Sequence, residues 1–290
     1  MLEYMQLIVS VYRYLKGYHE ERIEKNMKRV MLIISYDGTA YHGWQIQPHE
    51  VTVELKINQA LSELCQEEIK VIGASRTDAG VHALGSVAVF DTNSRIPAEK
   101  FAYALNARLP WDIRVQSSRL VPGDFHPRHC DCIKTYEYHI LNRKIGIPSM
   151  RLYSYHFHWK IDLEAMKKGA SYLVGEHDFK SFCSAKTQVT DTVRTIYSID
   201  LRQEGEEIIL KIRGNGFLYN MVRIITGTLL QVGTGYYKPE QIGEMLESKN
   251  RMAAGACAPA MGLFLVGIEY PGLPPESACI QALEQDSEIK

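Results

Sequence analysis

The chain has 290 residues, of which 46% are hydrophobic and 23% are charged. These values are typical of a globular protein with one large or two modest domains, and they exclude a disordered or fibrous chain. Its 33 basic and 34 acidic residues give a net charge of −1, which excludes a uniformly basic coat protein for nucleic acid but not a locally basic surface. No apolar run approaches the roughly 18 residues that a membrane-spanning helix needs.

The two ends of the chain differ in composition from the rest. Residues 1–26 are rich in Tyr and in charges of both signs, and Met27 comes just before a predicted strand. We expect residues 1–26 to be a helical extension or to reflect an upstream in-frame start, and residues 272–290 to form an acidic tail. The six cysteines are scattered and the first residues lack a secretory pattern, so we expect a cytoplasmic protein with reduced thiols.

Hydrophobic periodicity predicts the element order β-α-β-β-α-β in residues 27–123. Alternation with a period of two marks strands, and apolar residues three and four positions apart mark helical faces. Proline suits the first turn of a helix. In chain order we predict strand 30–36, a helix after Thr52, strands 69–74 and 84–90, a helix from Pro97 and strand 113–121.

The same order of elements recurs in residues 124–271. We predict strand 133–141, a helix from Asp162 that stops at Gly175, a hairpin of strands 195–201 and 208–213, an apolar helix 216–232, a short helix after Pro239 and strand 263–270. This repeat predicts an α+β fold with two ferredoxin-like (split β-α-β, RRM-like) subdomains, 27–123 and 124–271. We expect their antiparallel sheets to lie side by side, with a cleft between them.

Arg223 lies in the middle of the most apolar predicted helix, with apolar neighbours from Met221 to Ile225. A guanidinium stays protonated at neutral pH, and burying it without an anion has a high free-energy cost. Arg223 therefore needs a carboxylate or phosphate partner, or a cleft that opens onto one. The alternatives are a structural ion pair and a snorkelling side chain.

The segment Gly73–His82 places an Arg, a Thr, an Asp and a His between two predicted strands. Loops held between strands commonly present reactive side chains, which makes Asp78 a candidate catalytic residue. The alternative is a tight turn in which Asp78 binds the backbone and Gly80 supplies an unusual φ. Spacing alone favours neither interpretation.

The strand around Tyr136 alternates, so that Tyr136, Tyr138 and Ile140 share one face. Tyrosines on such a face pack in a core or form a stacking platform for a nucleobase. Between Arg108 and Arg151, eight basic residues outnumber four acidic ones. This basic stripe fits binding to a phosphate backbone, with a solvated charged surface as the alternative.

One short segment offers possible metal ligands, namely His126, His129, Cys130 and Cys132. A structural zinc site normally combines two separated ligand pairs, and the sequence has no second pair. We therefore interpret these residues as ordinary side chains on a strand and its approach, and we expect no metal site.

Four motifs follow one another along the chain: Arg76–His82 (RTDAGVH), Phe125–Arg128 (FHPR), Lys134–Tyr138 (KTYEY) and Gly216–Arg223 (GFLYNMVR). Together they resemble the signatures of the tRNA pseudouridine synthase A family, and the first motif is highly specific. The resemblance covers about residues 28–271. It implies a homodimer without cofactor or metal that isomerises uridine at positions 38, 39 or 40 of the tRNA anticodon stem-loop.

The resemblance also implies a role for each matching residue. Asp78 is expected to be the nucleophile, and Arg223 the residue that holds it. Arg223 is also expected to keep the pKa of Asp78 low, so that the carboxyl remains an anion that can attack. Tyr136 is expected to pack against the target base and to move its C5 proton. The substrate-binding residues implied are Arg76, which takes the place of the flipped nucleotide, Tyr136, Phe125, His126 and Arg128.

Two other functions fit part of the sequence. Residues 35–39 (SYDGT) look like part of the DxDGT loop of haloacid-dehalogenase-like phosphatases, but Ser35 stands where those enzymes have their nucleophilic Asp and the element order is not doubly wound. A non-catalytic RNA-binding module of two RRM-like sheets explains the aromatic residues and the basic stripe. It gives Asp78 and Arg223 no role.

Overall fold

The computed structural model describes residues 27–184 and 189–273. The predicted extension and most of the predicted acidic tail lie outside these residues. The strands are β1 (Lys28–Tyr36), β2 (Ile72–Gly73), β3 (His82–Thr92), β4 (Ile113–Val121), β5 (Ile133–Asn142), β6 (Tyr155–Phe157), β7 (Gly175–Asp178), β8 (Val193–Glu204), β9 (Glu207–Gly214) and β10 (Leu263–Glu269). The α-helices are α2 (Val53–Cys65), α3 (Phe101–Asn106), α4 (Leu163–Ser171), α5 (Met221–Gly233) and α6 (Gln241–Ser248).

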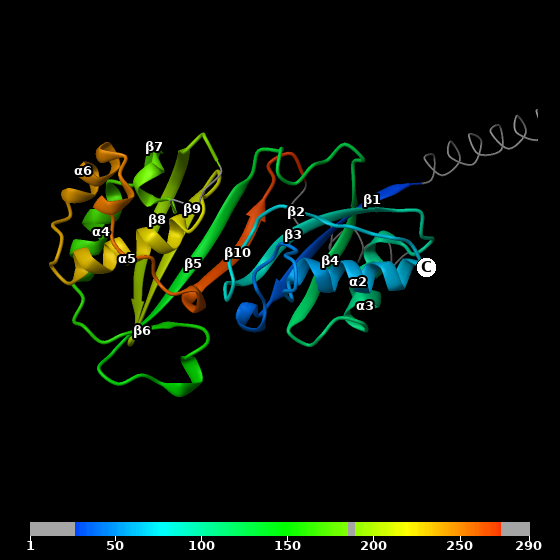
Figure 1. Cartoon of the computed structure of the whole chain (residues 1–290), viewed down its shortest axis with the longest axis horizontal. Helices are drawn as coiled ribbons and strands as arrows, with labels where there is room; N and C mark the ends of the chain where they lie inside the picture. Colours follow the sequence, from blue (N-terminus) through cyan, green and yellow to red (C-terminus); the bar gives the residue numbers. More distant parts are fainter. Residues whose placement is uncertain (1–26, 185–188, 274–290) are drawn as a thin grey trace, which may run out of the picture.

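All ten strands belong to one sheet, so the fold is mixed α+β (Figure 1). Eight of them follow the order β4-β1-β3-β10-β5-β9-β8-β7, while β2 pairs with β3 and β6 pairs with β5. β10 joins the two halves, because it pairs in parallel with β3 and antiparallel with β5. The structure therefore has one continuous sheet with two parallel pairings, β3–β10 and β5–β6, where the sequence predicted two antiparallel sheets.

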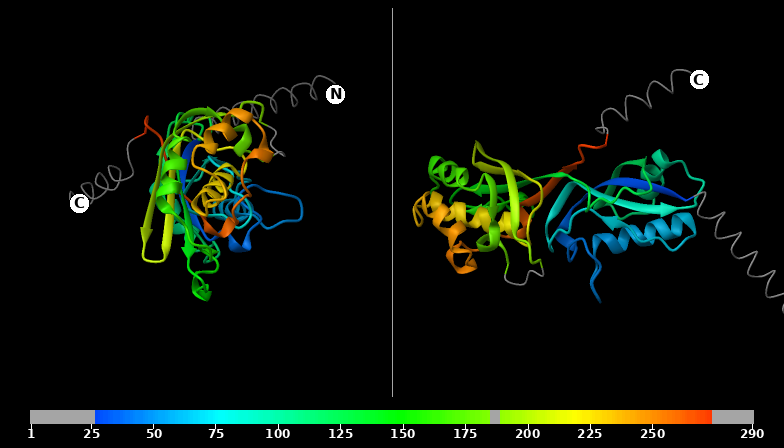
Figure 2. Two further views of the ribbon diagram at one scale, coloured as in Figure 1. Left: turned by 90° about the vertical axis from the view of Figure 1, so that its left-hand side faces the viewer. Right: turned by 90° about the horizontal axis from the view of Figure 1, so that it is seen from above.

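The helices bury their apolar faces in a core that runs along both halves of the sheet. Each described α-helix contributes residues to this core, such as Ile57, Phe101, Met166, Ile225 and Ile242. Figure 2 shows α2 and α5 on the same side of the sheet. None of the described helices has the length and apolar character to cross a membrane.

Local capping explains where two helices begin. The side chain of Thr52 accepts a hydrogen bond from the backbone N–H of Leu55, and that of Asp162 accepts one from Ala165, so α2 and α4 begin as predicted. The apolar helix predicted from Gly216 instead begins at Met221, because Asn220 has a left-handed φ of 62°. This shift places Arg223 in the first turn of α5 rather than in its middle.

Other elements also differ from the prediction. The strand predicted at 69–74 pairs only over Ile72–Gly73, and the helix predicted from Pro97 begins as a 3-10 turn over Ala98–Lys100. The short strands β6 and β7 were not predicted, since three or four residues carry too little periodicity to be recognised. The remaining predicted strands and helices are present with small changes at their ends.

Candidate active site

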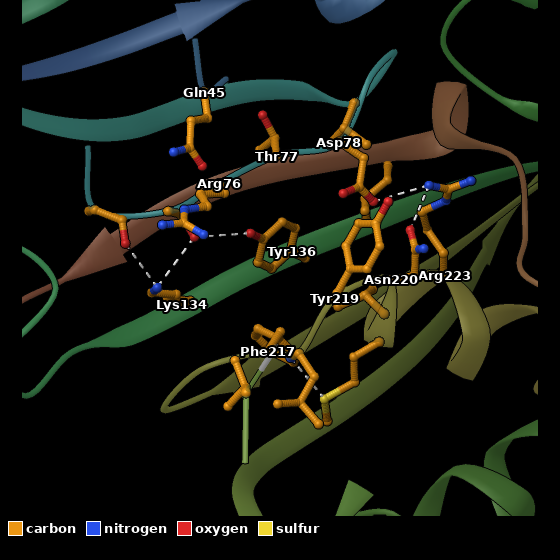
Figure 3. A pocket seen from close by; sticks show the side chains of 18 of the residues that line it. Gln45, Arg76, Thr77, Asp78, Lys134, Tyr136, Phe217, Tyr219, Asn220 and Arg223 are labelled. Carbon is orange, nitrogen blue, oxygen red and sulfur yellow. Dashed lines mark hydrogen bonds and ion pairs between the residues drawn. The ribbon is translucent and has the colours of Figure 1, made fainter. Parts of the chain in front are cut away.

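A cavity of about 870 Å³ is lined by residues from both halves of the sheet (Figure 3). The loop before β3 contributes residues 74–79, and the segment that leads into α5 contributes residues 217–223. Lys134 and Tyr136 of β5 lie between these two segments. Arg128, from the FHPR motif, lines the cavity as well, so the cavity brings together residues of all four motifs that the sequence singled out.

Asp78 and Arg223 form an ion pair at this cavity. Nη1 of Arg223 lies 3.1 Å from Oδ2 of Asp78. The side chain of Arg223 is 18% exposed and that of Asp78 is 23% exposed. Arg223 also donates from Nε to the carbonyl of Ala258 at 2.8 Å and from Nη1 to Oδ1 of Asn220 at 2.9 Å. The carboxylate partner that a buried arginine requires is therefore Asp78.

The pKa of Asp78 differs from the expectation. Burial raises the pKa of this carboxyl above its ordinary value, and the nearby charge and hydrogen bond of Arg223 oppose that rise without cancelling it. The predicted low pKa is thus wrong in direction, because desolvation of a residue cannot be judged from its sequence neighbours. Arg223 acts by limiting the rise.

The loop that carries Asp78 is fixed by its neighbours. The hydroxyls of Tyr36 and Thr77 lie 2.7 Å apart, and the backbone N–H of Trp44 donates to the Thr77 carbonyl at 3.1 Å. The loop also contains the tight turn considered as an alternative, since Val81 N–H donates to the Asp78 carbonyl and Gly80 has a φ of 75°. The turn uses only the backbone of Asp78, which leaves its side chain for Arg223.

Tyr136 lies on the wall of the cavity and is only 6% exposed. The ring of Phe217 packs edge-on against it, with ring centroids 5.3 Å apart. Its hydroxyl lies 3.4 Å from Oγ of Ser75, and burial raises its pKa to about 12. Tyr136 therefore offers both an aromatic surface and a hydroxyl to the cavity.

The cavity is strongly basic. Among the described residues that line it, Asp78 is the only acidic one, and the basic ones are Arg76, Arg128, Lys134, Arg194 and Arg223. The predicted basic stripe contributes two of these, Arg128 and Lys134. Other members of the stripe lie elsewhere: Arg114 donates to backbone carbonyls, including that of Pro110 at 2.7 Å, and Arg143 pairs with Glu206. Such a basic lining suits a polyanion.

Comparison with known proteins identifies the family. The sequence profile described as tRNA pseudouridine synthase matches residues 32–129 and 170–271. The chain belongs to the tRNA pseudouridine synthase family. It is 48% identical over 244 residues to a tRNA pseudouridine synthase A from Thermoanaerobacter sp. (strain X514), with 84% of this chain and 100% of that protein covered. A protein of the same name from Bacillus subtilis (strain 168) is 45% identical over 244 residues, with 83% of this chain and 99% of that protein covered. The resemblance inferred from the motifs is confirmed.

Two of the substrate-binding residues expected from the family motifs lie outside the lining of the cavity. Phe125 is buried on the other face of the sheet, where its ring packs edge-on against Tyr270 with centroids 5.1 Å apart. His126 stacks on His129 with ring centroids 3.9 Å apart, and His129 lines the cavity. Over residues 27–184 and 189–273, no three His, Cys, Asp or Glu side chains are grouped to hold a metal ion.

Several other residues of the cavity were assigned no role from the sequence, although three of them belong to the motif Gly216–Arg223. Phe217, Tyr219, Asn220 and Arg194 all line it. Figure 3 shows the ring of Tyr219 pointing toward Asp78. The signal that was available is Asn220, since Asn tolerates the left-handed conformation and so marks a helix boundary. A boundary there turns the preceding residues into a loop that faces the site.

Proposed function

We propose that this family member converts uridine to pseudouridine in tRNA, at positions 38, 39 and/or 40 of the anticodon stem-loop, with Asp78 as nucleophile and without a cofactor. The observation that supports this proposal most directly is a carboxylate held by Arg223 at a basic cavity with an aromatic wall. The basic lining suits the phosphates of an RNA, and Tyr136 suits the face of a uracil.

The reaction exchanges the C1′–N1 bond for a C1′–C5 bond. Asp78 adds through its carboxylate to C1′ or to C6 of the nucleotide, the C1′–N1 bond breaks, and the detached uracil turns so that C5 bonds to C1′ as Asp78 leaves. The C5 proton then departs, its bonding electrons restore the C5=C6 double bond, and N1 takes up a proton. Substrate and product contain the same atoms, so the balance requires no oxidant, reductant or cofactor.

The proposal assigns roles to several residues at the cavity and to one beside it. The uridine must leave the stack before Asp78 reaches it, which costs a few kcal/mol, and Arg76 takes the vacated place. Tyr136 packs against the uracil and accepts the C5 proton. Arg223 orients Asp78 and keeps more of it ionised than burial alone allows. Arg128 and His126, at the side of the cavity, contact the RNA backbone.

The proposal includes the assembly of the protein and its compartment. We infer a homodimer that works in the cytoplasm, where tRNA is modified. We also infer that the first half of the sheet with α2 and α3, and the second half with α4 and α5, are two ferredoxin-like subdomains with a boundary between residues 123 and 124. The order β-α-β-β-α-β of the main elements in each half supports this division.

The test is nucleoside analysis of tRNA incubated with wild type, Asp78→Asn and Asp200→Asn. Asp200 is exposed on β8 and serves as the matched control. We expect pseudouridine from wild type and Asp200→Asn, and a loss of at least about a thousandfold in Asp78→Asn, because Asn is not a nucleophile. Stem-loops that keep uridine at only one of positions 38, 39 and 40 identify which position is the target. Product from Asp78→Asn at the wild-type rate, or product only at other positions, contradicts the proposal.

A further inference from the structure

A line of three polar side chains ends at the hydroxyl of Tyr136 (Figure 3). Nζ of Lys134 lies 3.3 Å from Oγ of Ser75 and 3.2 Å from the carbonyl oxygen of Ala74. Oγ of Ser75 in turn lies 3.4 Å from Oη of Tyr136. Lys134 and Tyr136 are two residues apart on β5, whereas Ser75 belongs to the loop that carries Asp78. The line therefore ties the wall of the cavity to the loop of the nucleophile.

The chemistry of these groups gives the line a direction. An ammonium only donates hydrogen bonds, so Ser75 Oγ accepts from Lys134. The positive charge turns the hydroxyl dipole of Ser75 away from Nζ. Ser75 is only 9% exposed, and a buried hydroxyl hydrogen requires an acceptor. Tyr136 Oη lies 3.4 Å away on that side, so this polarisation favours Ser75 as the donor and Tyr136 as the acceptor.

We propose that Ser75 and Lys134 are positioning residues for Tyr136, which together favour its phenolate form and keep a lone pair of Oη available for the C5 proton. This inference rests on the proposed function. Tyr136 enters the step as a phenolate after giving its proton to solvent water. Oη then takes the proton from C5, the electron pair of the C5–H bond returns to the ring, and Tyr136 becomes a neutral phenol.

Burial and the charge of Asp78 work against a phenolate at Tyr136, and the hydrogen bond from Ser75 works in its favour. Burial raises the pKa of Tyr136 to about 12, Ser75 lowers it through its hydrogen bond, and the charge of Asp78 raises it. Burial lowers the pKa of Lys134. Other titratable or charged groups interact with Tyr136 and Lys134. Tyr36 of β1 interacts with Tyr136, and Lys134 interacts with Cys132, Arg128 and Arg194. Among all these, Ser75 is the group that hydrogen-bonds both Tyr136 and Lys134.

The experiment follows tritium release from tRNA labelled at uridine C5, in single turnovers with saturating protein over a range of pH. We expect Ser75→Ala and Lys134→Met to slow release about tenfold, because each removes a hydrogen bond or charge that stabilises an anion. Their alkaline rise moves to higher pH, and a C5-deuterium isotope effect increases as proton removal becomes slower. Ser75→Thr and Lys134→Arg keep the hydroxyl and the charge, so they retain most of the rate.

Matched controls are Ser171→Ala and Lys167→Met, two exposed positions on α4 outside the cavity. Binding of tRNA is measured separately for every variant. The inference is overturned if Ser75→Ala has the release rate, pH dependence and isotope effect of the wild type. It is also overturned if Lys134→Met loses affinity for tRNA but releases tritium at the wild-type rate. In either case wild type still forms product, so the proposed function stands. A wild type that releases no tritium contradicts the proposed function, and the inference falls with it.

Discussion

The guanidinium of Arg223 lies 3.1 Å from the carboxylate of Asp78, although 145 positions separate them in the sequence. Asp78 lies in the loop before β3, in the first half of the sheet, and Arg223 lies in the first turn of α5, in the second half. The pair therefore forms only when both halves fold against each other. The ionisation of Asp78 therefore depends on Arg223 from the second half of the sheet, and not only on the loop that carries Asp78.

The acid limb of the activity profile should depend on Arg223. Burial raises the pKa of Asp78 and Arg223 opposes the rise, so Arg223→Gln raises that pKa further. In the proposed mechanism the carboxylate is the attacking form, so activity is lost as pH falls through this pKa. We expect the acid limb to move to higher pH by about one unit in Arg223→Gln, measured as single-turnover pseudouridine formation against pH.

Stability provides a second readout of the same pair. The folded-state pKa of Asp78 lies above its unfolded value, so its contribution to stability is complete below the unfolded pKa and is lost as pH rises through the folded pKa. Without Arg223 the folded-state pKa of Asp78 is higher still, so the loss of stability as pH rises is larger. Urea unfolding should show a greater deficit for Arg223→Gln at about pH 7 than at about pH 4. An equal deficit at both pH values contradicts this assignment.

The position of Arg223 should depend on Gly227, one turn further along α5. A Cβ at Gly227 would lie 1.9 Å from the carbonyl oxygen of Ala256, in the loop whose Ala258 carbonyl accepts from Arg223 Nε. Gly227→Ala displaces that loop, and we expect a loss of about 1–3 kcal/mol in unfolding free energy and at least about tenfold in activity. Gly243→Ala in α6 is the control, since its Cβ has ordinary contacts. An active, stable Gly227→Ala would show that the loop does not hold Arg223.

The sequence predicted most of the elements because their signals are local. The caps at Thr52 and Asp162 and the alternation around Tyr136 each depend on residues within one turn or one strand. The joining of the halves through β10 has no such signal. β10 pairs with β3 across about 180 positions, and the choice of that partner depends on packing of the whole chain.

The candidate site was predictable where a residue conflicted with its surroundings. Arg223 among apolar neighbours required an anion, and the structure provides Asp78. Burial was not predictable from the sequence. The pKa of Asp78 is therefore raised where a low pKa was expected, and Phe125 lies in a core on the other face of the sheet rather than at the cavity. The motif Gly216–Arg223 contains Tyr219 and Asn220, but their place at the cavity was not predicted, because the start of α5 depends on one left-handed residue.

Binding of tRNA should depend on the basic lining of the cavity rather than on the whole predicted stripe. Arg194 lines the cavity, whereas Arg108 lies outside it near Glu63. We expect Arg194→Ala to weaken binding at low salt and to reduce the slope of log affinity against log salt by about 0.7, since each phosphate contact releases counterions. Arg108→Ala should leave the slope unchanged. The reverse pattern would place the RNA along the stripe.

The geometry of the loop that carries Asp78 should depend on Gly43, which contacts this loop from the segment before α2. Gly43 has a φ of +83°, and a Cβ there would lie 2.5 Å from the carbonyl oxygen of Thr77, the neighbour of Asp78. Gly43→Ala adds about 1–3 kcal/mol of backbone strain and also displaces the loop, so we expect lower stability and a large loss of pseudouridine formation. Gly205→Ala is the matched control, because Gly205 has a φ of +62° with nothing within 4 Å of its added Cβ. It should lose similar stability and retain activity. If thermal unfolding and single-turnover rates change equally in both variants, the contact between Gly43 and Thr77 has no part in holding Asp78.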